Sequence, residues 1–280
     1  MNTIRKKTQK NKQISLLSKF ILLLFVVSVL FPIAIIMVWS FIGRWPWPRL
    51  WPENFSTRGL EALFGGYSGA MQALGSSILL SIVVALLAVI IGAMTARALV
   101  FYDFFGKKAI AFGSILPIIV PGTVFGMGIH VLFIRVGLAN NVVGVILVHL
   151  ICALPYSIKI MTDITAAFGH KLEEQAETLG AAPGQILAYV TFPALLPGLV
   201  SSACMAYIIS FSQYFLTLLI GGGQVRTFSL MMVPFLQSGD RTVASAYSLV
   251  FIASTLLVFV IFEKALKKFH QENCGYFSLN

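Results

Sequence analysis

Charged side chains are scarce in this chain of 280 residues. Asp, Glu, Lys and Arg together make up 11% of it, whereas 58% is hydrophobic and the mean hydropathy is +0.89. Soluble domains carry about 25% charged residues, so the composition predicts a protein that lies in a membrane. The net charge of +10 does not indicate nucleic-acid binding, because the Lys and Arg residues flank apolar runs without an aromatic-rich basic face. Membrane lipid is the expected partner of these cations.

Cysteines and catalytic motifs are equally sparse. Cys152 and Cys204 lie in apolar runs and Cys274 lies near the C-terminus, without metal-ligand spacing, so neither a disulfide framework nor a zinc site is expected. The chain has no GxxxxGK[ST] loop for ATP, and its apolar runs lack GxSxG, HExxH and paired aspartates. We therefore expect no catalytic residue, no metal site and no cofactor bound by this chain.

Six apolar runs are long enough to cross a bilayer, which takes about 20 residues. They cover residues 17–42, 70–98, 109–136, 142–164, 194–220 and 243–264. The expected fold is an all-α membrane protein, a bundle of six transmembrane helices. The basic N-terminus followed by an apolar run resembles a signal sequence, but the run is long and no Ala-x-Ala site follows it, which favours a retained first span.

The positions of Lys and Arg predict the orientation of these spans. With the N-terminus inside, fourteen of the twenty cations fall in cytoplasmic segments and six fall outside. The cytoplasmic ones are Arg5, Lys6, Lys7, Lys10, Lys12, Lys19, Arg97, Lys107, Lys108, Lys159, Lys171, Lys264, Lys267 and Lys268; the outer ones are Arg44, Arg49, Arg58, Arg135, Arg226 and Arg241. The positive-inside rule thus predicts both termini in the cytoplasm.

This orientation divides the chain into five parts. A basic cytoplasmic tail (1–16) precedes the first span (17–42), an external loop rich in Trp and Pro (43–69), a core of five spans (70–264) and a second cytoplasmic tail (265–280). Tryptophan anchors at membrane edges and proline interrupts helices, so the external loop is expected to brace the membrane surface. Docking of an external partner is the alternative.

The segment 167–193, between the fourth and fifth spans, is predicted to contain a short amphipathic helix in the cytoplasm. Apolar residues fall on one side of a helical wheel and acidic residues on the other: Leu172, Ala176 and Leu179 against Glu173, Glu174 and Glu177. Gly180 is suited to end this helix and Pro183 to begin another. Three carboxylates would be repelled by anionic headgroups, so a protein groove is a better partner than lipid. A solvated connector is the alternative.

The same segment resembles a known family signature. Glu174-Gln175-Ala176, then Gly180, then Val190-Thr191-Phe192-Pro193 has the spacing of the Glu-Ala-Ala, Gly, Ile-x-Leu-Pro loop of inner-membrane permeases of binding-protein-dependent ABC importers. Gln175, Val190 and Phe192 depart from that pattern conservatively. Leu116–Gly128 and Ala153–Met161 also look like these permeases, and the resemblance covers roughly Ser76 to Phe262. In layout the chain resembles the polyamine, ferric-iron and phosphonate permeases.

The resemblance implies a bacterial inner-membrane protein that moves a solute with energy from another subunit. Its loop would be the coupling helix that docks into a cytoplasmic ATPase dimer, which binds ATP and Mg. Leu172 and Leu179 would fill a groove, Glu174 would face a basic or polar group, Ala176 would permit close approach, and Gly180 and Pro193 would shape the turns. A second permease, identical or not, and an extracytoplasmic solute-binding protein are further implied partners.

Polar residues within the spans are candidates for the solute path, because polar groups in a bilayer tend to face a cavity or a neighbouring helix. The fifth span offers Ser210, Ser212, Gln213, Tyr214 and Thr217. His130 and His149 are further candidates in the third and fourth spans. Hydrogen bonding between helices and ordinary packing are the alternatives for all seven residues. Lys159 and Asp163, one helical turn apart, are expected to pair with each other.

No acidic residue lies deep in a predicted span. A carrier driven by protons or sodium usually needs such a residue near the midplane, so this absence argues against a stand-alone carrier. Polyamine permeases, by resemblance, carry acidic residues where Ser212 and Gln213 stand here, which argues against a polycationic solute. A channel and a membrane scaffold remain alternatives, and the sequence does not name the solute.

Overall fold

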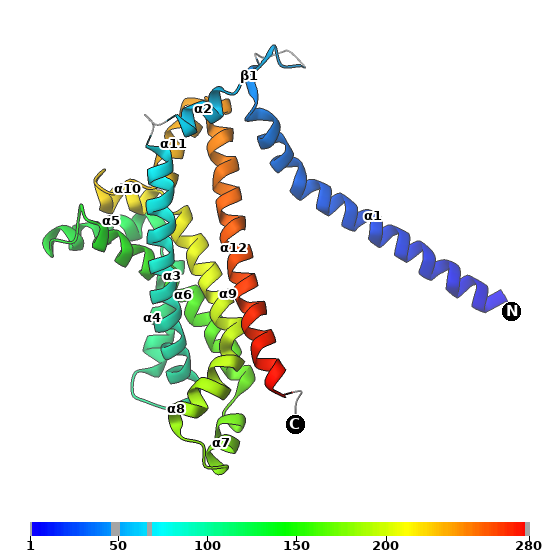
Figure 1. Cartoon of the computed structure of the whole chain (residues 1–280), viewed down its shortest axis with the longest axis vertical. Helices are drawn as coiled ribbons and strands as arrows, with labels where there is room; N and C mark the ends of the chain where they lie inside the picture. The colour runs from blue at the N-terminus through cyan, green and yellow to red at the C-terminus, as the bar shows by residue number, and fades with distance from the viewer. Residues whose placement is uncertain (1, 46–50, 66–68, 278–280) are drawn as a thin grey trace. The chain divides into compact units, whose positions relative to one another are not determined.

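The computed structural model describes residues 2–45, 51–65 and 69–277, with side chains from Leu17 to Lys264 within those ranges except at Arg44. It confirms an all-α membrane protein (Figure 1). Five helical segments are long and apolar enough to span a bilayer, and a bent pair is a sixth candidate. The spans are Leu17–Trp39, Ala70–Phe101, Val142–Phe168, Pro183–Ser212 and Arg241–Lys264; the pair is Lys107–Ile119 with Gly122–Arg135.

One compact unit comprises the chain up to residue 68 together with residues 235–250. Its elements are α1 (Asn2–Trp39), the strands β1 (Ile42–Arg44) and β2 (Asn54–Phe55), α2 (Arg58–Phe64) and parts of α11 (Phe228–Ser238) and α12 (Arg241–Phe277). The predicted N-terminal tail and first span thus form one helix, as do the last span and most of the C-terminal tail. Residues 46–50 and 66–68 of the predicted external loop lie outside the described residues.

Within this unit, β1 and β2 pair in antiparallel fashion, and polar contacts connect β1 and α2 to the start of α12. Thr242 donates a hydrogen bond to the carbonyl oxygen of Ile42 at 2.5 Å, and Arg58 forms an ion pair with Asp240 at 2.7 Å. The guanidinium of Arg241 lies over the Trp39 ring, 5.2 Å from its centre. A tryptophan and an arginine in this arrangement are typical of a membrane edge.

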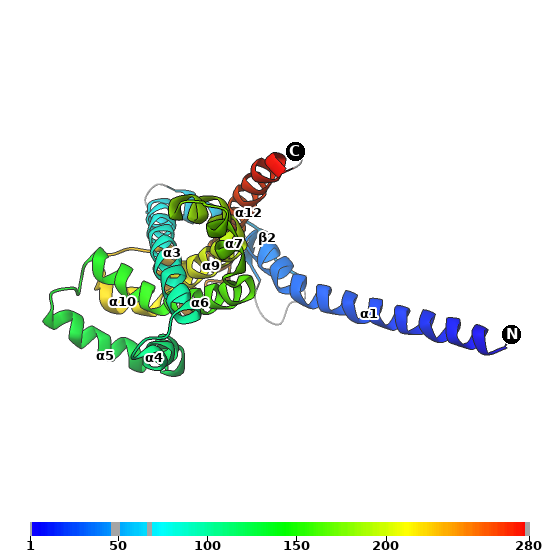
Figure 2. The same ribbon diagram turned by 90° about the horizontal axis from the view of Figure 1, so that it is seen from below.

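The second unit comprises residues 69–234 and 251–280. Its core is formed by α3 (Ala70–Phe101), α6 (Val142–Phe168) and α9 (Phe192–Ser212), which pack along one another (Figure 2). Small side chains allow close approach, since helices in a membrane associate by packing and hydrogen bonding rather than by excluding water. Ala88, Ala153 and Ala206 are fully buried here, one on each helix.

The bent pair returns the chain across this bundle. Arg97, near the end of α3, contacts Glu173, which follows the end of α6, so α3 and α6 run in the same direction. The segment between them must therefore cross back, and it contains α4 (Lys107–Ile119) and α5 (Gly122–Arg135), bent by 111°. The sequence predicted one span over 109–136 and did not predict this bend. Pro121 explains the difference, because its ring has no N–H and disfavours a helical conformation in the residue before it.

The fifth span also differs from the prediction of one helix over 194–220. Helical structure begins earlier, with α8 (Pro183–Ile186) and a π-helical turn η1 (Leu187–Thr191), and continues into α9. It stops after Ser212, and a separate helix α10 (Phe215–Gly221) follows. The segment 183–193, predicted as part of the cytoplasmic loop, is therefore continuous with the fifth span.

Candidate functional site

The predicted cytoplasmic loop contains a short exposed helix, α7 (Lys171–Thr178), at one end of the bundle (Figure 1). Leu172 is 48% exposed and Leu179, directly after the helix, is 87% exposed. Glu174 and Glu177 are exposed beside them, and Ala176 is half-buried. Apolar side chains with this exposure, outside the membrane spans and flanked by carboxylates, are typical of a surface that another protein covers.

Glu173 corrects the prediction of a polar face with three exposed carboxylates. Only 8% of this residue is exposed, because it turns toward the bundle and meets Arg97 of α3 in an ion pair at 2.7 Å. Thr191 donates a further hydrogen bond to the same carboxylate. The hydrogen bond from Arg97 holds the pKa of Glu173 below its ordinary value of 4.5, against the opposing effect of burial.

The exit from α7 follows the predicted turn chemistry. Gly180 has φ of 84°, a left-handed conformation that favours glycine, and Pro183 begins α8. The side-chain oxygen of Gln185 accepts a hydrogen bond from the amide of Ala182 at 2.9 Å, which stabilises the start of α8. Pro193 lies in the first turn of α9, where its missing N–H costs no helical hydrogen bond.

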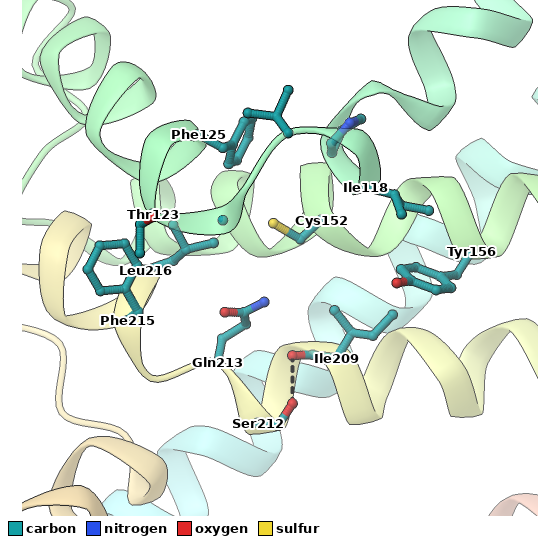
Figure 3. Close-up of a pocket in the computed structure, with 13 residues that line it drawn as sticks. Ile118, Thr123, Phe125, Cys152, Tyr156, Ile209, Ser212, Gln213, Phe215 and Leu216 are labelled. Carbon is teal, nitrogen blue, oxygen red and sulfur yellow. Dashed lines mark hydrogen bonds between the residues drawn. The ribbon is translucent and has the colours of Figure 1, made fainter.

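A cavity of about 570 Å³ lies within the second unit, where two helix interruptions face each other (Figure 3). One interruption separates α4 from α5 and the other separates α9 from α10. Figure 3 shows the Gln213 amide projecting into this space from the second interruption. The lining residues carry no charged side chain: Pro117, Ile118, Val120, Gly122, Thr123, Phe125, Cys152, Tyr156, Ile209, Ser212, Gln213, Phe215 and Leu216.

Interrupted helices suit a polar cavity. A helix end leaves backbone N–H and C=O groups without helical partners, and within a membrane such groups are tolerated where they are buried in protein or line a water-filled space. Ser212 and Gln213, two of the predicted path residues, line the cavity. Thr123, Cys152 and Tyr156 line it as well; their weakly polar side chains in apolar runs gave no signal in the sequence.

His149 belongs to a buried hydrogen-bonded cluster rather than to the cavity lining. Its Nδ1 lies 3.0 Å from Oγ of Ser210 and its Nε2 lies 2.9 Å from Oγ1 of Thr217. Thr217 donates its proton to the carbonyl oxygen of Gln213 at 2.8 Å, so the imidazole donates from Nε2 and accepts from Ser210 at Nδ1. The cluster ties α6 to both sides of the interruption between α9 and α10.

Two further predicted residues lie apart from these groups. Tyr214 sits at the interruption, half-buried, and is absent from the cavity lining. His130 is half-buried on α5.

Lys159 and Asp163 form the expected ion pair at 2.7 Å and are exposed. In the part of the chain that the structure describes, no three His, Cys, Asp or Glu residues are placed to hold a metal ion.

Residues 88–271 match the family model of the binding-protein-dependent transport system inner membrane component. This segment contains α7, the interrupted helices and most of the bundle. The chain belongs to this family. It is the permease component of an ABC importer, a non-catalytic transmembrane component and a multi-pass protein of the inner membrane. Membership of such a complex implies ATPase and binding-protein partners in general.

Curated relatives and one solved structure agree with this assignment. The chain is 26% identical over 216 residues to a spermidine/putrescine transport system permease from Haemophilus influenzae, covering 77% of this chain and 84% of that one. It is 27% identical over 248 residues to a putative 2-aminoethylphosphonate permease from Salmonella typhi, covering 88% and 92%. A crystal structure of a bacterial ABC transporter that imports the polysaccharide alginate has a similar fold, with TM-score 0.70, 19% identity and coverage of 91% and 97%.

Proposed function

We propose that α7 and its flanking turns are the surface through which this permease is driven by its ATPase. The observation that carries this proposal is the exposure of Leu172 and Leu179 outside the spans, beside Glu174 and Glu177. An apolar patch of this kind gains free energy when an apolar groove covers it, and the carboxylates fit a groove with a basic rim. ATP and Mg are bound by the ATPase dimer, so this chain transmits the energy of hydrolysis.

The cavity at the two helix interruptions is proposed as this chain's share of the solute path. A second permease, a copy of this chain or a sister chain, completes the path. Gln213, Ser212, Thr123 and Tyr156 supply hydrogen bonds without fixed charge. Such contacts hold a solute weakly and release it readily, which suits a path whose selectivity resides mainly in an external binding protein.

The solute is proposed to need no charged contact along this lining. The relatives are named for solutes of different charge. Spermidine and putrescine are cations at neutral pH, whereas molybdate and tungstate, named for a permease from Thermococcus kodakarensis that is 25% identical over 191 residues, are anions. Their names therefore give no common solute charge. The uncharged lining around Gln213 disfavours a polycation, for which a carboxylate would be the natural partner.

Both termini are proposed to lie in the cytoplasm of a bacterium. The excess of Lys and Arg in the corresponding segments supports this orientation. It also places α7 on the ATPase side of the membrane.

Purification of the tagged chain from its native membrane in mild detergent tests the coupling surface. We expect a chain with a GxxxxGK[ST] motif to co-purify and the eluate to hydrolyse ATP. Glu174→Lys and Leu179→Asp each reduce the recovered ATPase by roughly tenfold or more, the scale of a central interface residue. The control is Glu61→Lys, which reverses the charge of an exposed side chain on α2, in the unit that does not contain α7.

Two results would contradict the coupling role of α7. Recovery of the chain without any ATPase, or full retention of the ATPase by both α7 variants, would remove the coupling role from this surface. Solute movement by the purified chain alone, without ATP, would favour the carrier or channel alternative.

A further inference from the structure

Arg97 and Glu173 join α3 to α7 through a two-pronged ion pair. Nη1 of Arg97 lies 2.7 Å from Oε1 of Glu173, and Nη2 lies 3.1 Å from Oε2. The side chains are 30% and 11% exposed, so the pair is largely shielded from water. Two parallel N–H···O bonds fix direction as well as distance, because guanidinium and carboxylate are planar and matched in width. A rotation of α7 about its own axis would break at least one of them.

Thr191 connects the same carboxylate to the fifth span. Its hydroxyl donates to Oε1 of Glu173 at 2.5 Å. Thr191 is buried and is the last residue of η1, which leads directly into α9. One carboxylate thus links the exposed helix to the end of α3 and to the start of α9. Figure 2 views the bundle from this end.

Two aromatic rings lie beside the pair. The His170 ring lies 3.9 Å from the Phe101 ring, centre to centre, and Nδ1 of His170 is 3.6 Å from Oε2 of Glu173. The guanidinium of Arg97 lies 5.3 Å from the centre of the Phe101 ring. These contacts keep both partners of the ion pair in one orientation.

The pair is an unusual way to hold a short helix. Within α7, whose eight residues are all described, Glu173 is the one buried residue. A shielded ion pair adds little net stability over an apolar contact, because removing two charges from water costs about as much as their attraction returns. Its distinct contribution is a fixed orientation. The contacts therefore point to a role in the direction of α7 rather than in its attachment alone.

We propose that Arg97 is a positioning residue for energy coupling, which carries the movement of a docked α7 to α3 through Glu173 and to α9 through Thr191. This inference rests on the proposed function of α7. Both α3 and α9 pack along α6, and α6 contributes Cys152 and Tyr156 to the cavity lining. Without the pair, α7 stays docked on the ATPase but turns without moving the bundle.

Native Cys152 provides a readout of this movement. In the complex of this chain with its ATPase, with Cys204 and Cys274 replaced by Ser, the rate of Cys152 modification by N-ethylmaleimide reports access to the cavity. We expect a non-hydrolysable ATP analogue to change this rate by roughly fivefold or more, the lower range of measured coupling between sites. In Arg97→Gln the ATPase stays bound, but the nucleotide no longer changes the rate.

Two further variants separate orientation from packing. The exchange of Arg97→Glu with Glu173→Arg in one chain is expected to recover part of the nucleotide response, which a lost packing contact would not. Lys159→Gln is the matched control, because it removes the cation of an ion pair of the same 2.7 Å length that is exposed on α6. This control keeps the full response.

An unchanged nucleotide response in Arg97→Gln would overturn the inference. Release of the ATPase by that variant would also overturn it, since Arg97 would then act in docking. If Arg97→Gln does not assemble, Arg97→Lys decides, because it keeps the charge and loses the fork: a full response overturns the inference, and a weakened response with the ATPase bound supports it. Failure of the proposed function gives a different result from failure of this inference. In that case the chain with Arg97 intact would itself not bind the ATPase, or its Cys152 modification rate would not respond to nucleotide.

Discussion

Ser157 of α6 lies directly against Gly92 of α3. A methyl group on Gly92 would lie 2.2 Å from Oγ of Ser157. Ser157 donates to the carbonyl oxygen of Ala88 at 2.6 Å, and the hydroxyl of Ser202 on α9 lies 2.6 Å from that of Ser157. Three helices therefore meet at one pair of serines, and glycine is required where the backbones come together.

The first prediction concerns this contact. Gly92→Val forces α3 and α6 apart and should lower stability by about 1–3 kcal/mol, the usual cost of overpacking a core. The measurement is the midpoint of thermal unfolding in detergent. Gly75→Val is the control on the same helix, because Gly75 is exposed and a Cβ atom there meets nothing within 4 Å. Equal midpoints for the two variants would show that the contact is not tight.

The ion pair at Glu173 predicts a pH dependence of stability. The folded state lowers the pKa of Glu173 through Arg97, so its contribution is fully present above the ordinary value of 4.5 and fades as the pH falls through the lower native pKa. The chain with Glu173 should therefore exceed Glu173→Gln in melting temperature at neutral pH, and the difference should vanish in acid. Melting curves between about pH 3 and pH 7 measure it.

A control removes the other titratable neighbour of this carboxylate. His170 lies 3.6 Å from Glu173, so the comparison is repeated in a His170→Gln background. If the difference in melting temperature between the chain with Glu173 and Glu173→Gln grows as the pH falls, with or without His170, the pKa of Glu173 is not lowered in the folded state.

The histidine cluster predicts different outcomes for two histidines that the sequence did not separate. His149→Phe leaves Ser210 without its acceptor in a buried place and should lower stability by about 1–3 kcal/mol. His130→Phe, at a half-buried position on α5, should have little effect. Thermal unfolding of both variants distinguishes them, and equal losses would place His149 in ordinary packing.

The cavity predicts the chemical access of Cys152. A small maleimide should modify this thiol in the purified protein, and Gln213→Trp or Thr123→Trp, which place a large ring in the cavity, should slow the reaction by roughly tenfold. Leu86→Trp is the control, since Leu86 is 58% exposed on α3 and does not line the cavity. Equal slowing by all three variants would argue against a defined cavity.

The crossing of the bent pair predicts the topology of the loops beside it. A cysteine at Asp103 should be labelled by an impermeant reagent from the side on which α7 lies, and a cysteine at Ala139 from the opposite side. A pair that dips into the membrane and returns would place both positions on one side. That outcome would be incompatible with parallel α3 and α6.

The sequence was sufficient where one local pattern determines the structure. Hydropathy located the long spans, and the spacing from Glu174 through Gly180 to Pro193 located the exposed helix and its turns. The interruptions after Ile119 and Ser212 were not predicted, because a membrane helix tolerates Pro or Gln when neighbouring helices satisfy its backbone. The helical wheel placed Glu173 on the polar face with Glu174 and Glu177, and it could not reveal that Arg97, 76 residues earlier, would bury this carboxylate.

A π-helical turn lets the segment Leu187–Thr191 hold one residue more than an α-helix would. The amide of Phe192 bonds to the carbonyl of Leu187, five residues back, where an α-helix would use four. An extra residue in an α-helix would rotate everything after it by about 100°, and the wider turn takes up that residue without this rotation. Removing one residue from the turn should therefore leave α9 facing its neighbours as before, whereas adding one should rotate α9 and separate Ser202 from Ser157.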